Sequence, residues 1–228
     1  PAGRPGGRPL RGPARLRRGD ACGGGAMRPL YGLVLSGGAS RRMGEDKAAL
    51  AYEGRPQLDR AFSLLAPRVA RCFVSLRQDQ ATDGLRRAYP GITDRSDAIG
   101  PAGGLLAAHG DYPRVAWLVL ACDMPFVDAP TLDALILARR ADYTAVAFRS
   151  EHDGLPEPFC TIWEPVALER LSRQVAAGRV GPRHALSDGD TCLLSPRTPG
   201  ALDNINTPEE RRQAENRLAR RQEPTCHG

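Results

Sequence analysis

The sequence predicts an α/β protein with a doubly wound, mostly parallel sheet, and three observations support this fold class. Short apolar, β-rich runs alternate with segments of helical character. One run, Val115–Cys122, is apolar throughout, as expected of a central strand covered on both faces. Polar residues follow two runs, at Ser36 and at Asp123, and open α/β sheets bind ligands beyond the carboxyl ends of their strands. The expected architecture is therefore three-layered and Rossmann-like.

The predicted strands are short apolar runs that end at glycine, proline or polar residues. They are Tyr31–Leu35, Arg71–Leu76, Gly91–Thr93, Val115–Cys122, Tyr143–Phe148 and Cys192–Leu194. The central run stops before Pro125, because proline cannot continue a strand ladder. The stretch Ser150–Pro158 is polar and contains glycine and proline, so we expect a loop there.

The predicted helices show apolar residues three and four positions apart or a capping signal at the start. They are Gln57–Leu65, Gln80–Tyr89, Gly103–His109, Leu132–Arg140, Trp163–Ala177 and a last helix that begins at Pro208. Thr131 is the expected cap of the fourth helix. The last helix has Thr207 at its N-cap and Glu210 three residues later, which together form a capping box.

The positive net charge of the chain is concentrated in its first 26 residues. That segment contains six arginines and one aspartate, a charge of +5 out of the total of +6. Glycine and proline make up 12 of its residues, so it lacks the apolar surface needed to fold. We expect residues 1–26 to be a disordered basic extension, or translated sequence upstream of a natural start at Met27. A phosphate- or nucleic-acid-binding arm is the less favoured alternative, so we expect no nucleic-acid partner.

The remaining composition is that of an ordinary globular domain. Six dispersed cysteines form no Cys-x-x-Cys pair, so the sequence favours neither a zinc site nor a disulfide framework, and a reducing cytoplasmic location fits best. No apolar run approaches the about 18–20 residues that span a membrane, so we expect no membrane partner. The chain is long enough for one α/β domain, which we place at residues 27–228.

The loop Ser36–Lys47, after the first predicted strand, has the composition of a triphosphate-binding site. It matches neither the Walker A spacing nor the dinucleotide pattern Gly-x-Gly-x-x-Gly. Backbone N–H groups around Gly37 and Gly38 can line phosphates, and three cations can neutralise them. These cations are Arg41, Arg42 and Lys47. A glycine pair alone indicates no more than a tight turn, but the cations favour phosphate binding.

Two aspartates follow other predicted strands. Asp123 ends the central run, where a carboxylate can bind Mg²⁺; the alternative is a capped turn before Pro125. Asp94 follows the strand Gly91–Thr93, and a carboxylate can accept both N1–H and the 2-amino group of guanine. A solvated loop acid is the alternative for Asp94. From the residues alone, the neighbouring loop Ser36–Lys47 favours the metal site at Asp123, whereas the solvated loop acid is favoured for Asp94.

Other polar motifs are less specific. The loop Gly100–Gly104 opens a helix and can face a substrate or simply pack tightly. Asn204 and Asn206 can bind a second substrate or serve as turn residues. No catalytic triad is evident, and transfer of a nucleotidyl group to a phosphate acceptor needs only positioning and charge stabilisation.

The ordered set of motifs resembles the molybdenum cofactor guanylyltransferases of the nucleotidyltransferase superfamily. The resemblance begins with the loop Leu35-Ser-Gly-Gly-Ala-Ser-Arg-Arg-Met-Gly-x-x-Lys47. It continues through Asp94, Gly100-Pro-Ala-Gly-Gly104, Cys122-Asp-Met-Pro125 and Asn204-Ile-Asn-Thr-Pro-Glu209. In all it covers about Tyr31 to Glu210.

This resemblance implies transfer of GMP from GTP to the terminal phosphate of molybdenum-molybdopterin, with release of pyrophosphate. The implied GTP-binding residues are Leu35, Ser36, Gly37, Gly38, Lys47, Ser75, Asp94 and Asp123. The implied catalytic residues are Lys47, Asp123, Arg41 and Arg42, with Mg²⁺ at Asp123. The GTP-binding half would span about residues 27–125 and the molybdopterin-binding half about residues 126–220. A molybdoenzyme or a cofactor-chaperone protein would receive the product.

The chain departs from the family pattern at two of these positions. Ser36 stands where the family usually has alanine, and Ser75 stands where an asparagine is expected. One base or ribose contact is therefore in question. A molybdopterin cytidylyltransferase, a sugar-phosphate nucleotidyltransferase and a non-catalytic nucleotide-binding delivery protein are the alternative functions.

Overall fold

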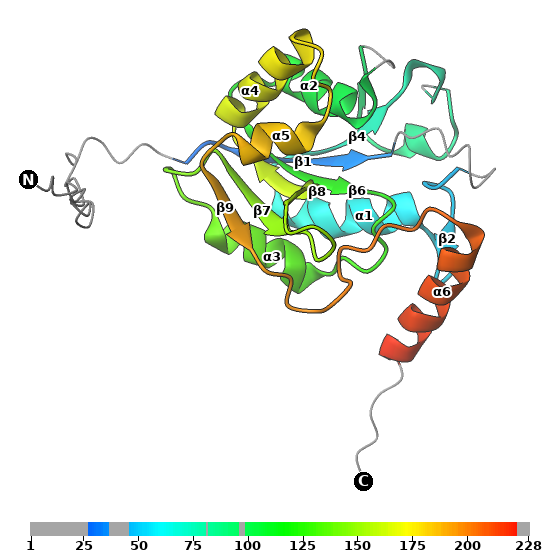
Figure 1. Cartoon of the computed structure of the whole chain (residues 1–228). Coiled ribbons are helices and arrows are strands. Elements are labelled where there is room, and N and C mark those ends of the chain that lie inside the picture. Colours follow the sequence, from blue (N-terminus) through cyan, green and yellow to red (C-terminus); the bar gives the residue numbers. More distant parts are fainter. Residues whose placement is uncertain (1–26, 37–45, 81, 96–98, 223–228) are drawn as a thin grey trace, which may run out of the picture.

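The computed structural model describes residues 27–36, 46–80, 82–95 and 99–222 (Figure 1). Within these ranges the central sheet has seven strands in the order β5-β4-β1-β6-β8-β7-β9. β8 runs antiparallel to both of its neighbours, and the other adjacent pairs are parallel. The predicted mostly parallel α/β sheet is confirmed.

The sheet strands follow one another along the chain with helices between most of them. The strands are β1 Leu30–Leu35, β4 Cys72–Leu76, β5 Gly91–Thr93, β6 Ala116–Ala121, β7 Ala145–Arg149, β8 Pro156–Trp163 and β9 Thr191–Leu194. The helices are α1 Gln57–Leu65, α2 Pro101–Asp111, α3 Ala129–Ala138, α4 Pro165–Ala176, α5 Pro182–Ser187 and α6 Pro208–Gln222. None of the helices described is long and apolar enough to cross a lipid bilayer.

Helices cover both faces of the sheet and bury two separate apolar clusters. Leu105 of α2, Leu168 of α4 and Leu186 of α5 belong to the cluster on one face. Leu58 of α1 and Leu132 of α3 belong to the cluster on the other face. Figure 1 shows α2, α4 and α5 on one side of the strands and α1 and α3 on the other. The expected three-layer architecture is therefore present.

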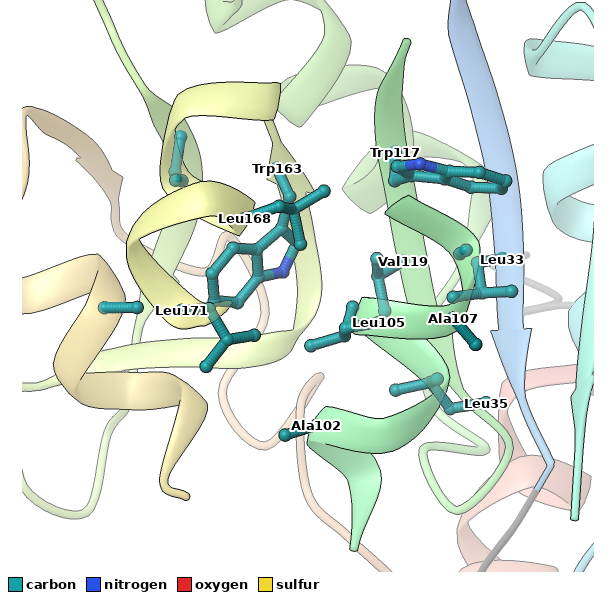
Figure 2. Packing of buried hydrophobic residues seen from close by; sticks show 14 of the residues in the cluster. Leu33, Leu35, Ala102, Leu105, Ala107, Trp117, Val119, Trp163, Leu168 and Leu171 are labelled. Atoms are coloured by element: carbon teal, nitrogen blue, oxygen red, sulfur yellow. The ribbon is translucent and has the colours of Figure 1, made fainter. Parts of the chain in front are cut away.

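The first of these clusters fixes α2 and α4 against the middle of the sheet (Figure 2). Trp117 on β6 and Trp163 on β8 are both fully buried in it. Leu35, the last residue of β1, packs in the same cluster near Ala102 and Leu105 of α2. Burial of these large side chains holds the carboxyl end of β1 in one place, because close-packed interiors tolerate little displacement.

The last helix packs apart from the main layers. Its Ala214 and Leu218 contact a small cluster with Tyr52, which lies in the hairpin β2 (Ala51–Tyr52) and β3 (Arg55–Pro56). The capping box is present: Glu210 Oε2 accepts from the Thr207 backbone N–H, and the Thr207 hydroxyl accepts from that of Glu210. The predicted start of this helix is confirmed.

The predicted helix over residues 80–89 is wrong. Two short 3₁₀ helices, η2 (Gln78–Gln80) and η3 (Arg86–Ala88), occupy this part of the chain. The segment has few apolar residues to form a buried helical face. Instead it turns the charged side chain of Arg86 into the interior, where only 1% of it is exposed.

The predicted loop over residues 150–158 is confirmed up to Leu155 but is wrong over its last three residues, and the predicted helix start at Trp163 is wrong. β8 begins at Pro156, extends to Trp163 and lies between β6 and β7. Its two prolines, Pro156 and Pro158, made the segment resemble a loop, although it pairs with β7 through a bulge. The cap of α3 is Asp128, whose carboxylate accepts from the Thr131 backbone N–H, rather than Thr131 itself.

Candidate functional site

The carboxyl ends of β1, β4, β5 and β6 meet at one edge of the sheet. Leu35 is level with Ser75 on one side and with Ala121 on the other. Because these four strands are parallel, the residues that follow them emerge at the same edge. Ser36, Ser75, Asp94 and Asp123 therefore come together as the sequence predicts.

Lys47 joins three segments that are distant in the sequence. Its Nζ lies 3.1 Å from Asp123 Oδ2 and donates to Asn206 Oδ1 at 2.5 Å. The Ile205 backbone N–H donates to the Asp123 carbonyl at 2.9 Å and holds the segment before α6 in place. The Lys47 and Asp123 side chains are 18% and 25% exposed. This cation–carboxylate pair is thus ordered but open to a ligand.

A second group of polar side chains is almost fully buried. The Ser36 hydroxyl donates to the Ser75 carbonyl at 2.7 Å, and the Ser75 hydroxyl donates to Asp94 Oδ1 at 2.8 Å. Asp94 is buried rather than a solvated loop acid, and its backbone N–H donates to the Leu76 carbonyl. Ser75, the departure from the family pattern, therefore orients the carboxylate that was predicted to read guanine.

Glycine at position 104 allows α2 to approach this group. A Cβ atom at Gly104 would lie 2.3 Å from Ser75 Oγ and 3.1 Å from Leu35 Cδ2. Gly100, before the helix, has a φ of 56°, which L side chains rarely adopt. The sequence left open whether the loop Gly100–Gly104 faces a substrate or packs tightly, and tight packing explains the glycine at position 104.

Sequence reasoning missed one charged residue of this region. The Arg86 guanidinium donates to the Ser36 hydroxyl and carbonyl and to both carboxylate oxygens of Asp46. It also pairs with Asp83. No sequence signal separates Arg86 from the neighbouring surface arginines, because its burial results from the tertiary fold.

The electrostatics of Asp46 follow from this contact. Burial alone would raise the pKa of the Asp46 carboxyl, but the hydrogen bond and charge of Arg86 outweigh it and hold that pKa below its ordinary value. Asp46 therefore remains ionised beside Lys47 at neutral pH. Four predicted phosphate-binding residues, Gly37, Gly38, Arg41 and Arg42, lie outside the described residues, and their role stays a prediction.

A cavity of about 570 Å³ lies at the segment before α6, which also contacts Lys47 and Asp123. Asn206, the partner of Lys47, lines it together with Asn204. Its wall also contains Glu157 of β8 and Arg183 of α5, with 3.8 Å between their closest charged atoms. Burial raises the pKa of Glu157 above its ordinary value. The cavity thus offers charges of both signs beside the cation–carboxylate pair.

The donor set for a metal is small. Among the residues that the structure describes, no group of three or more His, Cys, Asp or Glu side chains could hold a metal ion. Asp123 provides a partly exposed carboxylate at the strand edge, with Lys47 beside it, whereas the Asp94 carboxylate at the same edge is buried. Such an arrangement suits Mg²⁺, which is often bound by one or two carboxylates together with substrate phosphates.

The chain is similar to proteins of molybdenum cofactor biosynthesis. The chain is 36% identical over 182 residues to the "Molybdenum cofactor biosynthesis bifunctional protein" of Synechocystis sp.; this match covers 80% of the chain but spans only 52% of that relative's length. It is 32% identical over 190 residues to the "Molybdenum cofactor guanylyltransferase" of Xanthomonas euvesicatoria, covering 81% of the chain and 93% of that relative.

The fold comparison points the same way. The crystal structure of molybdopterin-guanine dinucleotide biosynthesis protein A from Archaeoglobus fulgidus matches with a TM-score of 0.70 and 22% identity, over 83% of this chain and 99% of that one. This likeness concerns the fold. Residues 32–192, which include both Lys47 and Asp123, match the family described as MobA-like NTP transferase domain. The chain belongs to this family of nucleotidyltransferases.

Proposed function

We propose that this protein transfers GMP from GTP to the terminal phosphate of molybdenum-molybdopterin and releases pyrophosphate. The observation that carries the proposal is the junction of Lys47, Asp123 and Asn206, which stands between the strand edge and the cavity. The names of relatives that share at least 30% identity over most of both chains support the choice of reaction.

GTP binds along the edge formed by β1, β4 and β5. The main chain at Leu35 and Ser36 lies against the triphosphate, with Gly37, Gly38, Arg41 and Arg42 supplying N–H groups and charge. The Asp94 carboxylate accepts from the N1–H and 2-amino groups of guanine, and Ser75 fixes its orientation. Adenine and cytosine lack this pair of adjacent donors.

Lys47 and Asp123 act at the reacting phosphates. The Lys47 ammonium neutralises phosphate charge, and Asn206 restricts its position through a hydrogen bond of 2.5 Å. Asp123 is the carboxylate that would hold Mg²⁺ together with phosphate oxygens. When bound, Mg²⁺ polarises the α-phosphate and stabilises the leaving pyrophosphate.

In this proposal molybdopterin binds in the cavity lined by Asn206, within the half formed by about residues 126–220. Its volume of about 570 Å³ lies within the range usual for small-molecule sites. The Arg183 guanidinium can pair with an anionic group, and the buried Glu157 carboxyl can accept from N–H groups of the pterin. Asn204 and Asn206 line the cavity, and Asn206 also accepts a hydrogen bond from Lys47.

The reaction balances without a protein nucleophile or a general base. An oxygen of the molybdopterin phosphate attacks the α-phosphorus of GTP, and the bond from the α-phosphorus to the bridging oxygen of the β-phosphate breaks. That phosphate is mostly deprotonated at neutral pH, since the second pKa of a phosphate monoester is about 6. The protein supplies position and charge stabilisation, as in other phosphoryl-transfer sites.

The decisive experiment offers the protein each of the four nucleoside triphosphates with Mg²⁺ and molybdenum-molybdopterin. Pyrophosphate release and the dinucleotide product are measured together. We expect GTP to give the highest kcat/KM. Preference for CTP would instead favour a cytidylyltransferase, and tight nucleotide binding without turnover would favour a delivery protein.

The cellular setting is a further part of the proposal. The four cysteines within the described ranges, Cys72, Cys122, Cys160 and Cys192, are all free thiols. Free, mostly buried thiols are compatible with the reducing cytoplasm. A molybdoenzyme or a cofactor-chaperone protein would take up the product.

A further inference from the structure

Arg86 has no role in the proposed reaction. It is nevertheless the most fully buried charged side chain near the sheet edge at the carboxyl ends of β1, β4, β5 and β6, which we call the nucleotide edge. Its guanidinium is 1% exposed. Nη2 donates to the Ser36 carbonyl at 3.0 Å and to Asp46 Oδ1 at 2.9 Å, while Nη1 donates to Asp46 Oδ2 at 2.6 Å. Arginine is seldom fully buried, so a buried arginine whose guanidinium makes this many hydrogen bonds needs a structural explanation.

Stability alone is a weak explanation for this buried charge. Removing the guanidinium from water costs about as much as its attraction to the partly exposed Asp46 and Asp83 carboxylates returns, and apolar residues often serve equally well. What the planar fork of arginine adds is geometry, because it binds two partners at fixed angles. Arg86 therefore determines where Ser36 and Asp46 lie relative to each other.

Ser36 and Asp46 are informative partners because they border residues 37–45, the predicted phosphate-binding segment. One guanidinium holds the residue before that segment and the residue after it. Lys47 follows Asp46 directly, and the Asp46 carboxylate also accepts from the Ala48 backbone N–H at 3.1 Å. The position of Lys47 therefore depends on the same side chain.

The contacts of Arg86 also extend toward the base-reading side. Arg86 Nε donates to the Ser36 hydroxyl at 3.1 Å, and that hydroxyl donates to the Ser75 carbonyl. Ser75 in turn donates to Asp94. An alanine at position 36 would have no hydroxyl to join these residues, so the Ser36 side chain is what connects Arg86 to Ser75.

We propose that Arg86 is a positioning residue that fixes Ser36 and Asp46 relative to each other and thereby places Lys47 for nucleotide binding. It acts through Ser36 and Asp46 and does not touch the nucleotide. This inference rests on the proposed function for the identity of the nucleotide, but its phosphate-binding part can be tested without that identity.

The test uses inorganic pyrophosphate, the product of any nucleotidyl transfer, titrated calorimetrically into the full chain with Mg²⁺. Arg86→Met removes the fork, Arg86→Lys retains a charge, and Ser36→Ala removes one acceptor. We expect pyrophosphate affinity to fall about 100-fold, about 10-fold and about 5-fold, respectively. For GTP, kcat/KM should fall in the same order, while the KM for molybdopterin stays within about twofold of the wild type.

Arg68→Met is the matched control. Arg68 makes an ion pair of 2.7 Å with Asp133 and a bond to the Leu64 carbonyl, but it lies in the connection that enters the amino end of β4. It should lower thermal stability without changing pyrophosphate affinity. A merely structural role of Arg86 would give the same pattern.

The inference is wrong if the folded Arg86→Lys and Ser36→Ala variants bind pyrophosphate as tightly as the wild type does. This test remains valid even if Arg86→Met fails to fold. Failure of the proposed function looks different. A wild type that binds pyrophosphate in an Arg86-dependent manner but does not use GTP would contradict guanylyl transfer and support the positioning role.

Discussion

The two halves of the sheet hold their polar groups in different ways. At the edge formed by β5, β4, β1 and β6, Ser36, Ser75 and Asp94 are at most 7% exposed and bonded to one another. Around the cavity beside β8, the side chains of His152 and Asp203 are 84% and 38% exposed. The first region is held in place by these bonds, whereas the exposed part of the cavity wall can adjust to a ligand; Glu157 is a buried exception in that wall.

This difference has an energetic meaning. A preorganised site costs little reorganisation when charge develops, so errors of position at the nucleotide edge should reduce turnover strongly. An open site whose side chains contact solvent should tolerate substitution and affect mainly substrate affinity. Four substitutions test this contrast, from the largest expected effect to the smallest.

Asp123→Ala should have the largest effect. It removes the predicted ligand of Mg²⁺ and leaves Lys47 without one of its partners, so kcat for pyrophosphate release should fall about 1,000-fold. Asp133→Ala removes an exposed carboxylate on α3 and should leave turnover intact. A loss smaller than tenfold for Asp123→Ala would show that this carboxylate has no essential role.

Asp94→Asn should change the base preference. The amide has one acceptor where the carboxylate has two, so kcat/KM for GTP should fall about 100-fold. The wild type should prefer GTP to ITP, which lacks the 2-amino group, and this preference should shrink at least about tenfold in the variant. Unchanged discrimination between GTP and ITP would remove Asp94 from base recognition.

Gly104→Ala tests the close packing at the nucleotide edge. The new methyl group would displace Ser75 Oγ, which lies 2.3 Å from the required position, and thereby disturb Asp94. We expect a loss of about 1–3 kcal/mol in stability and about tenfold in kcat/KM for GTP. Gly110→Ala on the same helix meets only ordinary contacts and should do neither. Equal behaviour of the two variants would contradict the proposed packing constraint.

Glu157→Gln tests the cavity and should have the smallest effect. Burial raises the pKa of Glu157 in the folded protein, so the unfolded chain releases this proton at lower pH and folding stability falls as pH rises above about 4.5. The neutral amide avoids this loss while its oxygen can still accept from the Phe159 N–H.

Melting curves between pH 4 and pH 8 provide the measurement for this variant. The gain in Tm should be about 3 °C at pH 8 and should vanish toward pH 4. Glu169→Gln, on the exposed side of α4, should show no such pH dependence. A constant Tm difference across the range would exclude titration of Glu157 as its cause. The KM for molybdopterin should rise while the KM for GTP stays constant.

The contrast also explains which features could be predicted from the sequence. Ser36, Asp94 and Asp123 follow strands that are parallel, and parallel topology brings such residues to one edge. Short, continuous apolar runs identified those strands. The convergence of the predicted site residues therefore required only the order of the elements and the polarity of the residue after each strand.

β8 and the burial of Arg86 could not be predicted from the sequence, because both depend on tertiary contacts. β8 contains two prolines and follows a polar stretch, so its sequence is typical of a loop. Pairing with the strands on both of its sides stabilises it as a strand. Arg86 is charged, and charge in a sequence normally indicates solvent exposure. Only the tertiary arrangement of Ser36, Asp46 and Asp83 makes its burial favourable. Clusters of this kind can be identified only from the folded structure.

The hydrogen bond between Lys47 and Asn206 has a consequence for the order in which the chain folds. Its partners are separated by 159 positions in the chain, so the intervening strands and helices must be in place before it forms. During synthesis, the lysine emerges from the ribosome long before the asparagine. A nascent chain should therefore form this bond only late in folding, and incomplete chains should lack the geometry that the proposed reaction needs.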